Sequence, residues 1–260
     1  MSSIVIIPSR YASSRLPGKP LCLLSGKPMI QHVYERARRA RLVQDVFVAT
    51  DNKLIYDTVE GFGGNAIMTS ETHPSGTDRI AEAIEKLQAI GHRFQATDII
   101  VNVQGDEPLI HPQMIDDVIR LMDDERASIG TLSKRIEDTT EVIDPNIVKV
   151  VFNSEGFALY FSRSPIPYHR NEWKDPGQIT VYGSQFTLFK HIGIYAYRKD
   201  VLLILSKLPP TKLEEIERLE QLRALENGFR IKVKETKFET IGVDTSMDLE
   251  RVEKCLNTSL

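Results

Sequence analysis

The sequence predicts an α/β fold with a doubly wound, mostly parallel, Rossmann-like sheet and a smaller mixed-sheet extension. Short apolar runs without polar alternation recur along the first half of the chain, which is typical of strands covered on both faces. Patterns of amphipathic helices stand between these runs. A β-α-β alternation of this kind favours a parallel sheet with right-handed crossovers.

Three strands and three helices alternate in the first half. The predicted strands cover residues 4–7, 46–49 and 99–103. Pro28 takes the first position of a predicted helix, a second helix begins near Thr77, and a third spans residues 112–122. The apolar stripes that identify the first two helices are Met29, Ile30, Val33 and Ala37, then Ile80, Ala83, Ile84 and Leu87.

The second half changes character. Residues 148–152 and 157–161 are predicted to be two strands joined by the turn at 153–156, which is a hairpin signal. The aperiodic segment 165–183 is predicted to be a long loop, and strand character resumes over 191–197. A helix is expected over 213–226, with Leu213, Ile216, Leu219 and Leu222 on one face and Asn227-Gly228 as its end. Thr245 is expected to cap a last helix.

These patterns contain no fold-scale repeat and no obvious linker, so we expect one domain over residues 1–260. Within it, residues 146–197 would form the mixed-strand extension and could supply a dimer face.

Composition and charge narrow the class of protein. A hydrophobic fraction of 41% can fill a core, and a formal net charge of −3 argues against general nucleic-acid binding but permits a local basic site. No stretch is long and apolar enough to span a bilayer, and no signal-peptide pattern precedes the first strand. Cys22 and Cys255 lack metal-ligand spacing and fit a reducing compartment. We therefore expect a cytoplasmic protein without membrane insertion.

The loop after the first predicted strand is basic. Between residues 8 and 21 it holds Arg10, Arg15 and Lys19 among glycine and other small residues. Ligands of open α/β sheets bind beyond the carboxyl ends of the strands, where cations would neutralise a phosphate chain. A solvated surface loop with incidental charge is the alternative interpretation. The loop is not a Walker A motif, because neither Gly-Lys pair of this region is followed by Ser or Thr.

Two aspartates follow other apolar runs. Asp106 stands in the segment 104–108 (Gln-Gly-Asp-Glu-Pro) after the strand at 99–103, and Asp244 follows a short apolar run in 242–245. A carboxylate beside a phosphate chain needs a bridging cation, and Mg²⁺ is the usual one. Each aspartate could instead cap a helix or form a turn. Sequence alone does not place their two segments side by side.

The chain resembles one family along nearly its whole length. The similar segments are residues 4–21, 75–79, 104–108, 158–163, 191–195, 219–223, 242–245 and 248–250. Together they resemble the 3-deoxy-manno-octulosonate cytidylyltransferases, or CMP-KDO synthetases, whose fold is of the nucleotide-diphospho-sugar transferase type. Ser9 and Ser14 depart slightly from the family pattern, and residues 169–188 match it poorly.

The resemblance implies that CTP and KDO, an eight-carbon keto-sugar acid, react to CMP-KDO and pyrophosphate, which activates KDO for lipopolysaccharide biosynthesis. The implied nucleotide-binding residues are Pro8, Arg10, Arg15, Lys19, Ser75, Gly76 and Asp106. Cytosine would be read at Ser75 and Gly76, largely through backbone groups. Catalysis would fall to Arg15, Lys19, Asp106 and Asp244, with Asp106 and Asp244 holding Mg²⁺. A homodimer is also implied.

The resemblance further implies a set of sugar-binding residues: Arg79, Gln104, Arg163, His191, Tyr195, Glu220 and Gln221. Arg79 or Arg163 would pair with the sugar carboxylate, which a guanidinium meets with two donors. A structural interpretation stays open for others in the set. His191 could be a satisfied strand histidine, and Glu220 and Gln221 could be ordinary exposed positions.

Two other functions remain open. One is a different cytidylyltransferase, acting on sialic acid or on an amino-substituted KDO. The other is a non-catalytic nucleotide-binding module that kept the fold and lost turnover, against which the intact Lys19, Asp106 and Asp244 argue.

Overall fold

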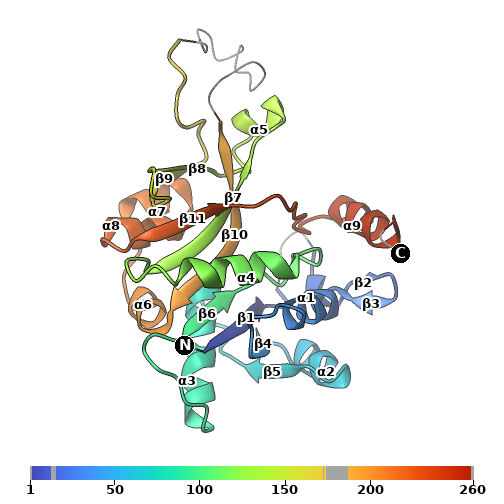
Figure 1. Ribbon diagram of the computed structural model, residues 1–260. Helices are drawn as coiled ribbons and strands as arrows, with labels where there is room; N and C mark the ends of the chain where they lie inside the picture. The colour runs from blue at the N-terminus through green and yellow to red at the C-terminus, as the bar shows by residue number, and fades with distance from the viewer. Residues whose placement is uncertain (1, 13–15, 172, 174–186, 259–260) are drawn as a thin grey trace.

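A central sheet with helices on both faces forms the body of the computed structural model, which describes residues 2–12, 16–171, 173 and 187–258 (Figure 1). The strands are β1 (Ser3–Ser9), β2 (Leu23–Leu24), β3 (Lys27–Pro28), β4 (Asp45–Thr50), β5 (Asn65–Met68), β6 (Ile99–Asn102), β7 (Ile129–Arg135), β8 (Lys149–Phe152), β9 (Ala158–Ser162), β10 (Phe189–Arg198) and β11 (Ile231–Glu235). The helices are the short 3₁₀ helix η1 (Lys19–Leu21), α1 (Met29–Arg38), α2 (Lys53–Gly61), α3 (Gly76–Ala89), α4 (Pro112–Leu121), α5 (Thr139–Ile143), α6 (Lys199–Leu205), α7 (Lys212–Glu217), α8 (Gln221–Glu226) and α9 (Ser246–Thr258).

The main sheet has the strand order β11-β7-β10-β6-β1-β4-β5. β6, β1, β4 and β5 pair in parallel, and so do β11 and β7, whereas β10 is antiparallel to β6 and β7. The strands predicted at 4–7, 46–49 and 99–103 are three adjacent members of this sheet, which confirms its mostly parallel character. Their carboxyl ends lie at one edge, where ligands of such sheets bind.

Each face of the sheet is covered by helices, which confirms the doubly wound prediction. On β1, Val5 and Ile7 belong to a core that also contains Ile30 of α1 and residues of α2 and α4. Ile4 and Ile6 point to the opposite face, into a core with Ile80 of α3 and residues of α6 and α8. Alternate residues of one strand thus enter two cores, so the strand is apolar throughout.

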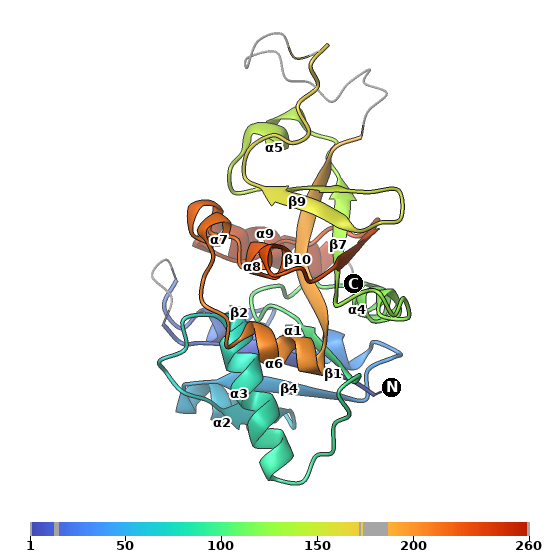
Figure 2. The same ribbon diagram turned by 90° about the vertical axis from the view of Figure 1, so that its left-hand side faces the viewer.

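The predicted extension stands at one end of the sheet (Figures 1 and 2). Its hairpin is β8 and β9, which pair in antiparallel as the turn at 153–156 predicts. β8 also pairs with β10, so the extension continues the main sheet. Of the loop predicted at 165–183, residues 172 and 174–183 lie outside the described residues. Among the helices described, none is long and apolar enough to cross a bilayer.

One predicted helix is wrong. The structure has two short helices, α7 and α8, where the sequence pattern predicts one helix over 213–226. Arg218 between them has a φ of 54°, in the left-handed region, so the helix ends there. Leu213 and Ile216 are therefore 36% and 78% exposed, although Leu219 and Leu222 are buried as expected. No glycine or proline marks the break, which is why the apolar spacing concealed it.

For α1, α3 and the last helix, the predicted first residue agrees with the structure to within about one residue. Pro28 is the residue before α1 instead of its first member, and α3 begins at Gly76 with Ser75 as its N-cap. The Thr245 hydroxyl accepts a bond from Asp248 N at 3.3 Å, and the Asp248 carboxylate accepts from Thr245 N at 2.9 Å. This reciprocal arrangement confirms that Thr245 caps the last helix.

Candidate active site

The segment after β1 forms the first wall of the site. Pro8 and Ser9 end the strand, Arg10 follows directly, and Lys19 begins η1. Gly18 before it has a φ of 68°, and its N–H donates to Tyr11 O at 3.1 Å, which closes the loop. A left-handed turn of this kind favours glycine. Arg15 lies outside the described residues.

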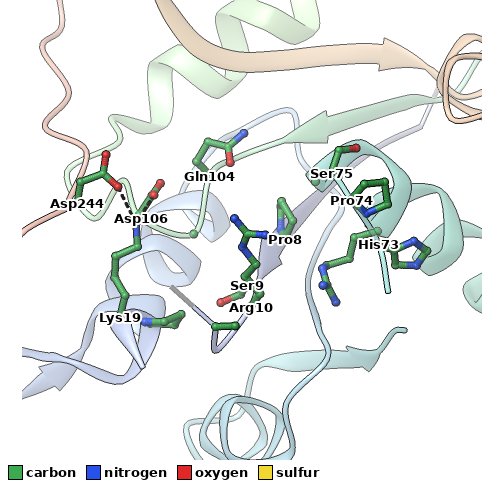
Figure 3. Close-up of a pocket in the computed structure, with 15 residues that line it drawn as sticks. Pro8, Ser9, Arg10, Lys19, His73, Pro74, Ser75, Gln104, Asp106 and Asp244 are labelled. Carbon is green, nitrogen blue, oxygen red and sulfur yellow. Dashed lines mark hydrogen bonds and ion pairs between the residues drawn. The ribbon is translucent and has the colours of Figure 1, made fainter. Parts of the chain in front are cut away.

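Lys19 lies between the two predicted metal-binding carboxylates. Its Nζ is 2.6 Å from Asp106 Oδ2 and 3.2 Å from Asp244 Oδ1 (Figure 3). The Lys19 side chain is only 13% exposed, against 33% for Asp106 and 47% for Asp244. We call these three residues the acid–lysine cluster. The structure thus brings together two carboxylates whose proximity the sequence left open.

Backbone contacts hold the cluster together. Val243 N donates to Asp106 O at 2.9 Å, which ties the segment of Asp244 to the loop after β6. A Cβ built on Gly105 would lie 3.0 Å from Pro8 O, so a side chain here would push this loop slightly away from the end of β1. The close passage carries Asp106 to Lys19.

The carboxylate pair fits a divalent cation. Asp106 and Asp244 already share one positive charge, the Lys19 ammonium, between their oxygens. Among the described residues, we find no group of three or more His, Cys, Asp or Glu side chains that could hold a metal ion. Mg²⁺ at this pair would take its other ligands from water and phosphate oxygens, which is its usual arrangement beside nucleotides.

A cavity of about 370 Å³, which we call the outer cavity, opens in front of the cluster. In Figure 3 the acid–lysine cluster stands at one side of it, and His73, Pro74 and Ser75 stand at the other. Every described residue of the predicted nucleotide set lines it: Pro8, Arg10, Lys19, Ser75, Gly76 and Asp106. The N-terminus of α3 opens into this cavity, where backbone N–H groups favour negatively polarised ligand atoms.

A second cavity of about 190 Å³, the inner cavity, adjoins the first, and Gly76 and Gln104 line both. Four predicted sugar-binding residues line it, namely Gln104, Tyr195, Glu220 and Gln221. The Ser75 hydroxyl, at the N-cap of α3, donates to Glu220 Oε1 at 2.9 Å and so connects the walls of the two cavities.

Burial drives Glu220, Tyr195 and His191 toward their neutral forms, whereas the ion pair with Glu214 raises the pKa of Arg223, which also lines the inner cavity. Desolvation raises the pKa of the Glu220 carboxyl, although hydrogen bonds from the Ser75 and Thr77 hydroxyls oppose this. Burial also raises the pKa of Tyr195 far above its usual range. His191 lies behind Tyr195, with ring centroids 5.3 Å apart, and burial lowers its pKa to about 3.

His191 is not among the residues that line either cavity. Its Nε2 lies 2.9 Å from Thr131 Oγ1, so the histidine is held by a neighbouring strand. The structure therefore places it beside the sugar-binding candidates, where it supports Tyr195.

The two arginines expected to meet a sugar carboxylate have other partners. Arg79 is 3% exposed, lines the outer cavity, and donates to Asp51 Oδ2 and Thr69 Oγ1 at 2.6 and 2.5 Å. Arg163 donates to the carbonyl oxygens of Glu217 and Pro145 at 2.7 and 2.8 Å and lines neither cavity. Neither guanidinium is brought to the inner cavity.

The sequence interpretation missed several lining residues. Asn102 and Thr77 line the inner cavity, His73 lines the outer one, and Arg223 fixes α8 through an ion pair with Glu214 at 2.6 Å. Asn102 could have been found, because it ends a strand at the ligand-binding edge. His73 carries no such signal, since its loop is placed by contacts distant in sequence.

Comparisons with known proteins agree with this geometry. The model of the cytidylyltransferase family matches residues 4–237. A 3-deoxy-manno-octulosonate cytidylyltransferase of Thermodesulfovibrio yellowstonii is 56% identical over 258 residues, which are 99% of this chain and 99% of that protein. One of Geobacter sulfurreducens is 52% identical over 253 residues, covering 97% of this chain and 98% of that one. A solved CMP:2-keto-3-deoxy-manno-octonic acid synthetase complexed with CTP is 44% identical, with a TM-score of 0.88 over the full length of both chains.

Proposed function

Since this chain belongs to the 3-deoxy-manno-octulosonate cytidylyltransferase family, we propose that it joins CTP and KDO to give CMP-KDO and pyrophosphate. The observation that carries the proposal is the pair of adjoining cavities. The outer one holds the acid–lysine cluster, the inner one holds the hydrogen-bonding groups of Gln104, Tyr195, Glu220 and Gln221, and both share Gly76 and Gln104. The product would activate KDO for lipopolysaccharide biosynthesis.

The reaction needs positioning and charge neutralisation more than covalent help from the protein. The anomeric hydroxyl of the sugar would attack the α-phosphorus while pyrophosphate leaves on the opposite side. Arg10 and Lys19 line the cavity in which the phosphates would lie, and Lys19 would stabilise the negative charge that develops on them. A similar role for Arg15 stays a prediction.

Asp106 and Asp244 are the residues that would hold Mg²⁺. When bound, this ion would neutralise phosphate oxygens and lower the pKa of the attacking hydroxyl. Lys19 compensates only one of the two carboxylate charges, and the remaining negative charge beside the cavity proposed for the triphosphate is the observation that supports the metal.

The inner cavity suits the hydroxyl-rich part of the sugar acid. Gln104, Tyr195, Glu220 and Gln221 offer donors and acceptors there, and burial favours neutral forms of Glu220 and Tyr195. To bind the sugar carboxylate, Arg79 would have to exchange its pairing with Asp51.

A nucleotide panel tests the proposal. Pyrophosphate release is measured with KDO and CTP, UTP, ATP or GTP, with sialic acid and an amino-substituted KDO as competing sugar acids. We expect turnover with CTP and KDO, weaker turnover with UTP, and little with the purine nucleotides, which are too large for a pocket shaped at Ser75 and Gly76. Equal rates with ATP and CTP would show that the base pocket is misassigned. Binding of CTP without release would favour a non-catalytic module.

We also propose that the protein is a cytoplasmic homodimer. Among the described residues β9 pairs with β8 alone, apart from a single bridge at Phe157, and Leu159 on β9 is 63% exposed. An exposed strand with an apolar residue suits contact with a second copy. Light scattering should give twice the chain mass of 29.5 kDa, and Leu159→Asp should shift it toward the monomer. A wild-type monomer would contradict the dimer.

A further inference from the structure

One face of α3 holds residues 68–73 in place. This segment leads into residues 73–76, which form the wall of the outer cavity proposed to bind the nucleotide. Arg79, Glu82 and Lys86 are spaced so that they share this face. Lys86 Nζ donates to Met68 O at 2.8 Å, and Arg79 Nη1 donates to Ser70 O at 3.2 Å. Together with Glu82 they attach residues 68–73 to the helix.

Glu82 makes the central attachment. Its Oε2 accepts from Ser70 N at 2.7 Å and lies 2.5 Å from His73 Nε2, while its Oε1 lies 2.8 Å from Lys86 Nζ. Burial alone would raise the pKa of Glu82, but hydrogen bonds from Lys86, Ser70 N–H and His73 outweigh it and lower the pKa to about 2. The carboxylate therefore stays charged and acts as a fixed acceptor for two points of the segment.

The attachment reaches the outer cavity through His73. His73 lines that cavity next to Pro74, Ser75 and Gly76, and its side chain is only 19% exposed (Figure 3). Glu82 does not line the outer cavity. It lies behind His73 and lines a separate surface groove, to which Glu85 also contributes. Any effect of Glu82 on a bound nucleotide must therefore pass through the segment that it holds.

We infer that Glu82 is a positioning residue of the nucleotide pocket, which fixes His73 and residues 70–73 so that the wall at 73–76 is formed before CTP binds. The inference rests on the proposed function, because that function identifies the nucleotide. A wall that is already ordered spares the nucleotide the entropy of ordering it. Without the carboxylate, Ser70 N–H and His73 lose their shared acceptor and the segment gains freedom.

A matched pair of substitutions on α3 tests the inference. Glu82→Gln removes the charge and leaves one acceptor oxygen where the carboxylate used two, so Ser70 N–H, His73 and Lys86 can no longer all be satisfied. Glu85→Gln removes the same charge about one helical turn away, from an exposed residue on the groove. CTP affinity is measured by calorimetry with Mg²⁺ present, and kinetic constants by pyrophosphate release. We expect Glu82→Gln to weaken CTP binding about tenfold, which corresponds to about 1.4 kcal/mol.

The same variant should leave the maximal rate at saturating CTP and the KM for KDO within about twofold of wild type, because nucleotide binding is weakened equally in the ground state and in the transition state. Glu85→Gln should match wild type throughout. Equal CTP affinity in Glu82→Gln and wild type would overturn the inference, as would equal losses in the two variants.

A second variant covers the case in which Glu82→Gln does not fold, which circular dichroism would reveal. In that case His73→Ala alone should weaken CTP binding, and an unchanged CTP affinity would overturn the inference. Where Glu82→Gln folds, the double variant of Glu82→Gln and His73→Ala should lose no more affinity than the weaker-binding single variant, since the pair acts as one unit. Additive losses would show that the two residues act separately. Wild type that binds CTP without releasing pyrophosphate would contradict the proposed function alone, whereas wild type that does not bind CTP would overturn both.

Discussion

The outer and inner cavities adjoin, yet the acidic groups beside them differ in charge state. The acid–lysine cluster places Lys19, Asp106 and Asp244 within ion-pair distance at the open edge of the sheet. Around the inner cavity, burial shifts Glu220, Tyr195 and His191 toward their neutral forms. The difference matches the two proposed substrates, because a triphosphate needs neutralisation and sugar hydroxyls need hydrogen bonds. The buried arginines of the two cavities, Arg79 and Arg223, are each paired with a carboxylate, so the contrast concerns the acids, the tyrosine and the histidine.

Removal of divalent metal should reduce the rate of pyrophosphate release more than any other change that distinguishes the two cavities. Two carboxylates beside a triphosphate are repulsive unless a cation lies between them. We expect excess EDTA to abolish pyrophosphate release and added Mg²⁺ to restore it. Full activity in EDTA would show that the carboxylates serve another purpose and that the outer cavity does not depend on metal.

Lys19→Ala should cause the next largest reduction in the maximal rate. Loss of one donor that stabilises developing charge typically reduces the rate by about a hundredfold to a thousandfold, or about 2.7–4 kcal/mol. The protein should stay folded, because Lys19 lines the outer cavity and is not part of the hydrophobic core. The measurement is the maximal rate at saturating CTP and KDO, with circular dichroism as the check on folding.

Lys27→Ala is the matched control for Lys19→Ala. Lys27 follows a similar Ser-Gly turn, is 47% exposed and pairs with Glu35 at 2.9 Å, away from the residues that line either cavity. It should leave the rate within about twofold of wild type, since an exposed ion pair contributes about 0–1 kcal/mol. An inactive Lys27→Ala beside an active Lys19→Ala would reverse the assignment of the basic loop.

A smaller effect is expected for His191, whose protonation should make the free energy of unfolding depend on pH. Its folded pKa of about 3 lies below the unfolded value of 6.5, so the stability it contributes is present above pH 6.5 and is lost as the pH falls toward 3. Between pH 7.5 and 5 the loss should approach about 2 kcal/mol. Urea denaturation of wild type and His191→Gln at both pH values measures it, and the variant should lose less. Equal losses would mean that burial does not lower the pKa of His191.

Much of this could be predicted from sequence, because local signals and sheet geometry agree. The apolar runs and the basic loop after β1 place the nucleotide-binding edge, since strand ends of parallel sheets gather there. The break at Arg218 could not be predicted, because its left-handed backbone is stabilised by tertiary contacts such as the bond from Arg163 to its carbonyl oxygen. The partners of Arg79 were equally hidden, since Asp51 and Thr69 lie far from it in sequence.

One measurement tests the central contrast most directly: the maximal rate after the same carboxylate-to-amide change in each cavity. Asp106→Asn should reduce it by at least about a hundredfold, with CTP affinity little changed, because a charge that supports the reaction is lost. Glu220→Gln should reduce it by less than about tenfold, because Glu220 lines the inner cavity and is not a member of the acid–lysine cluster, and an amide keeps an oxygen that can bind the sugar hydroxyls. A similar loss in both variants, or a larger loss in Glu220→Gln, would contradict the account.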